Sequence, residues 1–322
     1  MAFDLASRIP IGPEDVGIAL SRGALGSHLG VAYCDENGNP RLLHFAWHRQ
    51  LKVDPYPPDN PTWIASIMLL YEECTSQAVA LVCGMADKYG NKHGLAEGIE
   101  YGINLFVGGK TFDLDGTYRP SPDNDGVTCA TIISKIFNDI GFPLVDLKTW
   151  KPNAINKAWG NAIVCMLEAT HVNPAHIERV KMNVSGLRLR PEEVAAAGEL
   201  NPDDRPAPHS IIEYRADELL RQIDSSCGSD RDLPEGPFRP CIAAYRSAVN
   251  ELFKSRERDV RRRIRAKSKF RSVTAAALKF RRRISRWQIR RIPWLRLKLK
   301  YFMHGKRNRH FKIRIISTKK NL

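Results

Sequence analysis

The 322-residue sequence lacks the signatures of several large protein classes. It contains no run of about 18 apolar residues, the length that a membrane-spanning helix needs. Its first residues, Met1 to Ala6, hold no basic segment followed by an apolar run, so we expect no signal peptide. It also lacks a Walker loop, a GxGxxG element, an HExxH pair and a GxSxG elbow. The commonest nucleotide-binding, zinc-protease and serine-hydrolase patterns are therefore excluded.

The cysteines lack the spacing of a metal site or of a disulfide framework. Their number is odd and none forms a CxxC pair; they are Cys34, Cys74, Cys83, Cys129, Cys165, Cys227 and Cys241. We therefore expect neither metal nor disulfides, and a reducing cytoplasmic location. Cys34, Cys74, Cys83 and Cys165 fit the interpretation of small buried apolar residues. His171 and His176 lack a third ligand, so they do not predict a metal site either.

Acidic residues are missing from the last fifth of the chain. Residues 260–322 contain 24 of the 50 Lys and Arg and no Asp or Glu. The 35 acidic and 26 remaining basic residues give residues 1–259 a formal charge of −9, within a total of +15. An acidic body thus precedes a strongly basic tail, and such a tail favours polyanionic partners.

Apolar and aromatic residues are interspersed with the positive charges of this tail. Their spacing around residues 275–291 predicts a basic helix with one apolar stripe, which Pro293 should end or kink. The alternation from Leu295 to Lys300 is typical of a strand or an interfacial segment. The candidate partners are an anionic membrane surface or nucleic acid. The alternative is a solvated extension that touches the acidic body.

The body begins with a predicted β-hairpin. Residues 28–33 form one expected strand, residues 35–40 the turn and residues 41–48 the returning strand. After a proline-rich loop, an apolar stripe predicts a helix over about 62–86. A second hairpin is expected, with strands over 103–107 and 110–113. Short helices are expected over 211–223 and 240–256.

The segment around Cys129 is the most informative. Thr128 is an expected N-cap and Gly141 an expected C′ residue, with an apolar stripe between them. Cys129 would then occupy the first helical position, where free backbone N–H groups and the helix dipole stabilise a thiolate. The same start, including the backbone N–H of Cys129, could bind an oxyanion. Asp123 and Asp125 would make turn hydrogen bonds, or steady this loop, or bind substrate.

A nucleophilic thiol needs an imidazole to take its proton, and the first hairpin supplies histidines. The run Ser27-His28-Leu29-Gly30-Val31-Ala32-Tyr33, then Leu43-His44-Phe45-Ala46, then a downstream helix opening at Cys129 resembles the NlpC-type papain-like superfamily. The order is similar to that of its circularly permuted branch, which includes the lecithin:retinol acyltransferase-like enzymes. The resemblance covers residues 20–145. It implies that Cys129 is the nucleophile, His28 the general base and His44 the group that orients His28.

The length of the hairpin turn leaves the third member open. If residues 35–40 lie outside the ladder, His28 lies nearly opposite His44. If the strands run on to a tight turn, His28 faces His48 instead. Ala130 follows Cys129 where some acyltransferase members carry polar neighbours, so the substrate class stays open.

These interpretations combine into one hypothesis. We expect an α+β chain with a permuted papain-like catalytic domain over 1–171, a polar helical region over 172–259 and a basic tail over 260–322. It would be a thiol hydrolase or acyltransferase that cleaves an amide, ester or thioester through an acyl-enzyme on Cys129, with no cofactor or metal. It would be cytoplasmic, with the tail able to place it at a membrane. The alternative is a non-catalytic adaptor that binds nucleic acid, an anionic membrane or an acidic partner through the tail.

Overall fold

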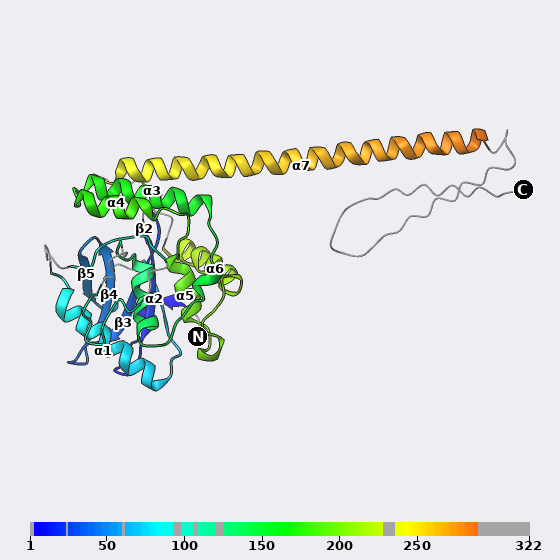
Figure 1. The fold of residues 1–322 in the computed structure, drawn as a ribbon. Helices are drawn as coiled ribbons and strands as arrows, with labels where there is room; N and C mark the ends of the chain where they lie inside the picture. The colour runs from blue at the N-terminus through cyan, green and yellow to red at the C-terminus, as the bar shows by residue number, and fades with distance from the viewer. Residues whose placement is uncertain are drawn as a thin grey trace, which may run out of the picture. The chain divides into compact units, whose positions relative to one another are not determined.

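A computed structural model describes residues 3–23, 25–59, 62–92, 98–105, 109–119, 125–227 and 236–288 of the chain. The chain divides into two compact units, residues 1–254 and 255–322. The first unit is an α+β structure with one antiparallel sheet, and the candidate site lies within it (Figure 1). In the described ranges, no helix has the length and apolar character to cross a membrane.

The sheet is built mainly from a meander. Its strands are β1 (Asp4–Leu5), β2 (Gly17–Gly23), β3 (Gly26–Cys34), β4 (Pro40–Trp47), β5 (Gln50–Pro55) and β6 (Trp63–Ile67). Their order across the sheet is β1-β6-β2-β3-β4-β5, and every pairing is antiparallel. Gly30 of β3 pairs with His44 of β4, and Leu42 of β4 pairs with Asp54 of β5. This register decides which side chains share a face.

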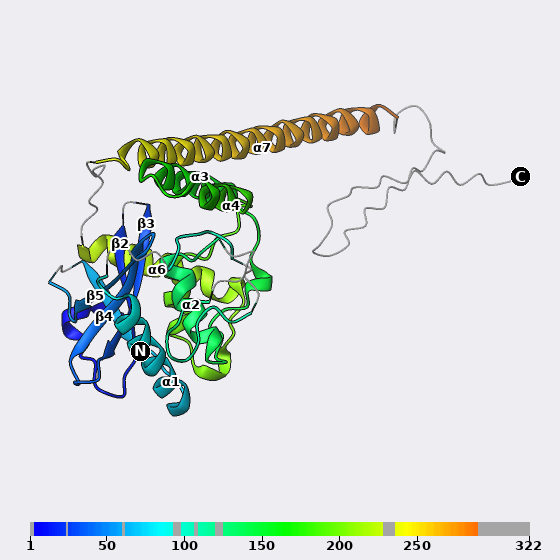
Figure 2. The same cartoon turned by 60° about the vertical axis from the view of Figure 1, so that its left-hand side comes forward.

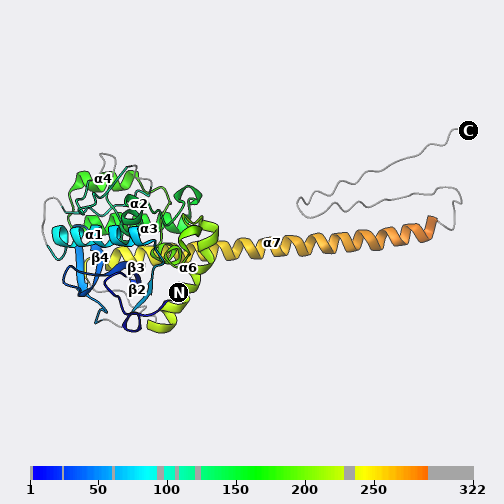
Figure 3. The same ribbon diagram turned by 90° about the horizontal axis from the view of Figure 1, so that it is seen from below.

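One face of the sheet is covered by helices. These are α1 (Glu72–Tyr89), α2 (Cys129–Asp139), α5 (Pro191–Gly198) and α6 (His209–Cys227), and Figure 2 shows α2 beside the strands. Figure 3 shows α1 running across the strands. Leu29, Val31 and Phe45 of the sheet pack here with Ile132 and Ile136 of α2. The other face has its own smaller core, which includes Ala32, Leu42 and Trp63 and is covered by the N-terminal segment through Ala6 and Ile11.

Two local predictions are confirmed. The first hairpin forms β3 and β4, joined through a turn in which Asp35 accepts hydrogen bonds from the backbone of Asn37 and Asn39. The helix expected after Thr128 is α2. Thr128 caps it by accepting from the backbone N–H of Thr131, and Gly141 follows its end with a φ of +83°.

The helix predicted over 62–86 is wrong at its start. Residues 63–67 form strand β6, and α1 begins only at Glu72. β6 lies between β1 and β2, and both of its faces are buried: Ile64 faces the helices, and Trp63 and Ala65 face the smaller core. A strand that is apolar on both faces does not alternate, and its pattern resembles a helix stripe.

The predicted second hairpin is also not formed in the described residues. Asp125 accepts hydrogen bonds from the backbone N–H groups of Ile103 and Asn104, and Asp139 accepts from those of Thr111 and Phe112. Two buried carboxylates thus take the donors that a strand ladder would have used. Residues 106–108, the end of the first predicted strand and the first residue of the predicted turn at 108–109, lie outside the described residues.

Residues after 171 complete the core of the first unit instead of forming a separate region, so the expected boundary at 171/172 does not divide compact units. Helices α3 (Ala154–Ala169) and α4 (Pro174–Met182) precede α5 and α6. The described residues also include the 3₁₀ turns η1 (Ala6–Arg8), η2 (Leu147–Thr149) and η3 (Pro202–Asp204). Buried side chains of α5 and α6, such as Val194 and Leu219, pack with the sheet strands. α5 is buried along its whole length, whereas α6 buries one stripe and exposes a polar face, so the overall polarity of this region did not indicate a core.

The last helix, α7 (Arg239–Gln288), begins in the first unit and extends into the second. It contains the predicted helix over 240–256 and the described part of the basic helix predicted around 275–291. Pro293 and the strand expected over 295–300 lie outside the described residues, as do the side chains from 264 onward.

The expectation of no disulfide is wrong. Cys165 of α3 is bonded to Cys241 at the start of α7, with 5.7 Å between their Cα atoms. The two cysteines lie 76 residues apart, and only the packing of α7 on α3 brings them together. Spacing in the sequence could not indicate this pair. Cys34, Cys74, Cys83 and Cys129 are free thiols.

The disulfide gives the first prediction. Denatured protein that has been reduced beforehand should react with two more equivalents of a thiol reagent than unreduced protein. Closing a loop of this length stabilises a folded chain by up to about 4.5 kcal/mol in the chain-entropy model. Reduction should therefore lower the midpoint of urea unfolding, and Cys241→Ser should reproduce that loss. Equal thiol counts with and without reduction would contradict the bond.

Candidate functional site

A cavity of about 200 Å³ lies where the start of β3 meets the end of β4. The strands contribute Ser27, His28, Ala46 and Trp47 to its wall, and the turn between β2 and β3 contributes Leu25. The start of α2 contributes Thr128 and Cys129. Helix α3 contributes Trp159, Ile163 and Met166. The chain before α5 contributes Arg188 and Leu189, and the first residue of α5 contributes Pro191; Tyr101 completes the wall. The cavity thus brings together two of the residues predicted from sequence, Cys129 and His28.

Cys129 lies at the first position of α2, as predicted. The N-cap Thr128 and Thr131 bond each other reciprocally, so the helix start has a fixed geometry. Burial raises the pKa of the Cys129 thiol to about 11, because a thiolate would lose its hydration there. The backbone N–H groups of Leu29 and Ala130 and the charge of Arg188 act in the opposite direction. In the resting structure the thiol is therefore neutral.

The histidines of the hairpin form a hydrogen-bonded chain that ends on a carboxylate. His28 Nε2 lies 2.9 Å from His44 Nδ1, and His44 Nε2 lies 2.9 Å from Asp54 Oδ2. By strand alternation the three side chains share the face that carries Trp63, and both imidazoles lie 5.7 Å from the Trp63 ring. Of the two alternatives for the third member, the structure brings His44 to His28.

The carboxylate at the end of the chain fixes the tautomers. Asp54 can only accept when ionised, so His44 carries its proton on Nε2. His44 Nδ1 then accepts from His28, so His28 carries its proton on Nε2. The remaining nitrogen, His28 Nδ1, is left with a lone pair and has no hydrogen-bond partner among the described residues. A chain of this kind orients the imidazole as a base.

Burial keeps both histidines neutral. The pKa of His28 is lowered to about 3, first by loss of hydration and then by the neighbouring His44. The pKa of His44 is also lowered by burial, although its hydrogen bond to Asp54 opposes that effect. The side chain of Asp54 is 44% exposed, whereas that of His44 is 11% exposed. The charged end of the chain therefore faces water and the basic end faces the protein.

Cys129 and His28 share the cavity but are not hydrogen-bonded to each other in the described structure. Helix α2 packs on the face of Leu29, whereas His28 belongs to the opposite face. Both residues nevertheless line the cavity, because the cavity lies at the end of the sheet and extends around the first residues of β3. The Cys129 sulfur accepts a hydrogen bond from the backbone N–H of Leu29, the residue directly after His28.

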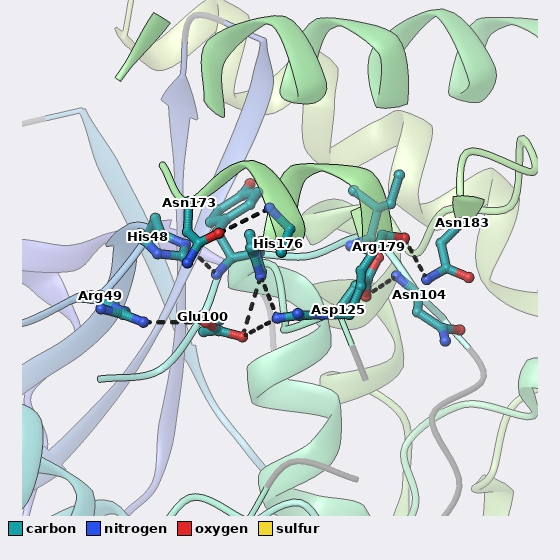
Figure 4. Close-up of polar contacts among 12 residues, drawn as sticks. His48, Arg49, Glu100, Asn104, Asp125, Asn173, His176, Arg179 and Asn183 are labelled. Carbon is teal, nitrogen blue, oxygen red and sulfur yellow. Dashed lines mark hydrogen bonds and ion pairs between the residues drawn. The ribbon is translucent and has the colours of Figure 1, made fainter. Parts of the chain in front are cut away.

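His48 has a different place, in a polar cluster beside the cavity (Figure 4). Its Nδ1 accepts the backbone N–H of Tyr101 at 3.2 Å, and His176 Nε2 donates to the Tyr101 carbonyl at 2.9 Å. Glu100 binds His176, Arg49 and Arg179, and its pKa is lowered to about 2, with the His176 hydrogen bond as the largest cause. Two imidazoles thus bind the two peptide groups that flank Tyr101, and they position the Tyr101 ring in the cavity wall.

The same cluster braces the turn that leads into Cys129. Val127 and Tyr101 form a bridge, with the Val127 N–H bonded to the Glu100 carbonyl. Asp125 is fully buried and binds the backbone of residues 103 and 104. These contacts match the role in which Asp125 holds the loop before Cys129 in place. Asp123 lies outside the described residues.

Sequence reasoning missed three groups of this site. Asp54 lies on β5, a strand that was not predicted because it runs directly into the proline-rich loop. The β4–β5 register brings Asp54 to His44. Arg188 reaches the cavity from a segment with no recognisable motif. Glu192 is buried, accepts from the Ser27 hydroxyl and pairs with Arg190 at 3.1 Å. All three depend on contacts between distant segments.

No protein-family model, curated protein or solved structure matches this chain. No cluster of three or more His, Cys, Asp or Glu that could hold a metal ion occurs among the described residues. The reactive groups of the site are a buried thiol, an oriented neutral imidazole and the N–H groups at a helix start.

The buried His28 predicts an acid-sensitive fold. An unfolded histidine titrates near pH 6.5, whereas the pKa of folded His28 is about 3, so the unfolded chain binds more protons between these values. Its contribution is fully present above pH 6.5 and is lost as the pH falls toward 3. The slope from one such group is at most about 1.4 kcal/mol per pH unit.

We therefore expect His28→Asn to make the free energy of unfolding less dependent on pH between 6.5 and 4.5, measured by urea titration. The slope is the readout, because the substitution also changes packing. His171→Asn is the control, since His171 is exposed and has a φ of +55°, which Asn tolerates. An unchanged slope in His28→Asn would show that His28 does not titrate with folding.

Proposed function

We propose that this protein is a cysteine-dependent hydrolase or acyltransferase with a permuted papain-like catalytic arrangement. The observation that supports it is the His28–His44–Asp54 chain, whose free basic nitrogen belongs to a residue lining the same cavity as Cys129. The position of Cys129 at a capped helix start supports the same proposal. The substrate bond would be an amide, ester or thioester.

In this mechanism His28 Nδ1 takes the proton of the Cys129 thiol as Sγ attacks the substrate carbonyl. The tetrahedral oxyanion would bind the N–H groups at the start of α2, including that of Cys129. His28 then gives the proton to the leaving group, and an acyl-enzyme remains on Sγ. Water or an acceptor alcohol or amine, deprotonated by His28, attacks the acyl group and releases the thiol.

The neutral resting pair is compatible with this mechanism. His44 and Asp54 would stabilise His28 as it becomes imidazolium, because the positive charge can be balanced by the carboxylate through the shared hydrogen bonds. The proposal requires the Sγ atom of Cys129 and the Nδ1 atom of His28 to come within hydrogen-bond reach when substrate fills the cavity. Catalytic hydrogen bonds are often long before substrate binds.

Alkylation by iodoacetamide across pH tests the thiol–imidazole pair, with the modified cysteines identified by peptide mass mapping. If Cys129 and His28 pair as the reagent enters the cavity, alkylation should show an apparent pKa below about 8.5, well under the value of about 11 of the resting buried thiol. In His28→Ala the midpoint should move up toward 11, the value that burial gives the thiol. Half-buried Cys74 is the internal reference. If wild-type Cys129 also titrates near 11, the pair does not form, and the adaptor alternative through the basic tail becomes the better hypothesis.

The hydrogen-bonded chain predicts an order of effects. His28→Ala should lower the rate of Cys129 alkylation at pH 7 most, by about tenfold or more. His44→Ala should have a smaller effect, and Asp54→Asn the smallest, because Asn can still accept from His44 but carries no charge. Asp35→Asn is the matched control, since the contacts of Asp35 within the described structure are with its own turn and Arg41, away from the cavity. Equal rates in all four variants would contradict the role of the chain.

A further inference from the structure

The cavity beside Cys129 has one cationic group in its wall. Arg188 lies over the Trp159 ring, with its guanidinium carbon 3.9 Å from the ring centre. It forms no ion pair with any carboxylate in the described part of the chain. The nearby buried carboxylate, Glu192, is held instead by Ser27 and Arg190.

The remaining wall is mostly apolar. Leu25, Ala46, Trp47, Ile163, Met166 and Leu189 line it. A guanidinium that is stacked on an aromatic ring, half-buried among apolar side chains and without a counterion is poorly compensated. An anionic oxygen group on a ligand would supply the missing charge and accept two parallel hydrogen bonds.

We propose that this cavity binds a small substrate with an apolar body and an anionic oxygen group, and that Arg188 recognises that group. The inference rests on the proposed function in taking the Cys129 cavity as the substrate cavity. The volume of about 200 Å³ lies below the roughly 300–1,000 Å³ of sites for drug-sized ligands, so the apolar body is a short chain or a single ring. The anion lies at Arg188 and the reacting carbonyl at Cys129.

Arg188 would therefore determine which substrates bind, whereas Cys129 and His28 would carry out the reaction. Its charge also lies near enough to favour the thiolate form of Cys129. An anionic ligand bound at Arg188 would screen that effect, so binding and thiol reactivity must be measured separately.

Matched small probes test this inference by their quenching of tryptophan fluorescence, because Trp47 and Trp159 both line the cavity. The probes are 3-phenylpropionate, phenyl phosphate and the neutral 3-phenyl-1-propanol, each titrated into the full chain at low salt. The inference expects at least one anionic probe to bind about tenfold or more tightly than the alcohol. The phosphate and carboxylate arms show which anion the site prefers.

Arg188→Met should remove the preference for the anion while leaving binding of the alcohol within about twofold, because the apolar stem is kept. Arg188→Lys should retain part of the preference. Arg8→Met is the matched control: it removes an arginine that is exposed and lies on η1. Equal binding of anion and alcohol, a preference that survives Arg188→Met, or no binding of any probe would each overturn the inference.

The same titrations in Cys129→Ala separate this inference from the proposed catalytic function. If the anion preference persists there while wild-type Cys129 alkylates as slowly as a buried thiol, the cavity is an anion-selective binding site without catalysis. If Cys129 is reactive but the anion preference is missing, the catalytic proposal survives and the substrate class proposed for Arg188 does not.

Discussion

The hydrogen bond from His44 to Asp54 determines what the rest of the site can do. A carboxylate accepts but does not donate, so this one contact sets the proton on His44, then the proton on His28, and leaves a single basic nitrogen at the far end. Without Asp54 the two imidazoles could exchange donor and acceptor roles, and His28 would have no defined basic atom. The exposed position of Asp54 keeps its charge hydrated, while the nitrogen that it orients belongs to a buried residue.

The sheet end is where this polar chain and the thiol approach each other. Helix α2 packs through Ile132 and Ile136 on one face, and the histidines occupy the other. The first residues of β3 lie at the end of the sheet, where one cavity is lined by residues from both sides of it. The cluster around Tyr101 reinforces that location, since His48 and His176 bind the backbone N–H and carbonyl of Tyr101 and Asp125 binds the backbone that follows. The cavity is therefore built by backbone contacts from several segments.

Local sequence patterns predicted the local parts of the structure. The hairpin and the Thr128–Gly141 helix follow from turn and capping residues, which act over a few positions. Strand β6 was assigned to a helix because its two buried faces remove the alternation on which a strand prediction depends. Asp54 and Arg188 were missed because register and long-range packing bring them to the site. The choice of His44 over His48 likewise needed the observed turn.

The disulfide between α3 and α7 has a topological consequence for the cavity. Residues 165–241 form a covalently closed ring, and Arg188, Leu189 and Pro191 of the cavity wall are members of it. Met166, which also lines the wall, is adjacent to the bonded Cys165. The strand side of the cavity, with His28 and Trp47, lies outside the ring. The bond therefore restrains the segment that carries Arg188, and reduction of Cys165–Cys241 would release that covalent restraint on one side of the cavity wall.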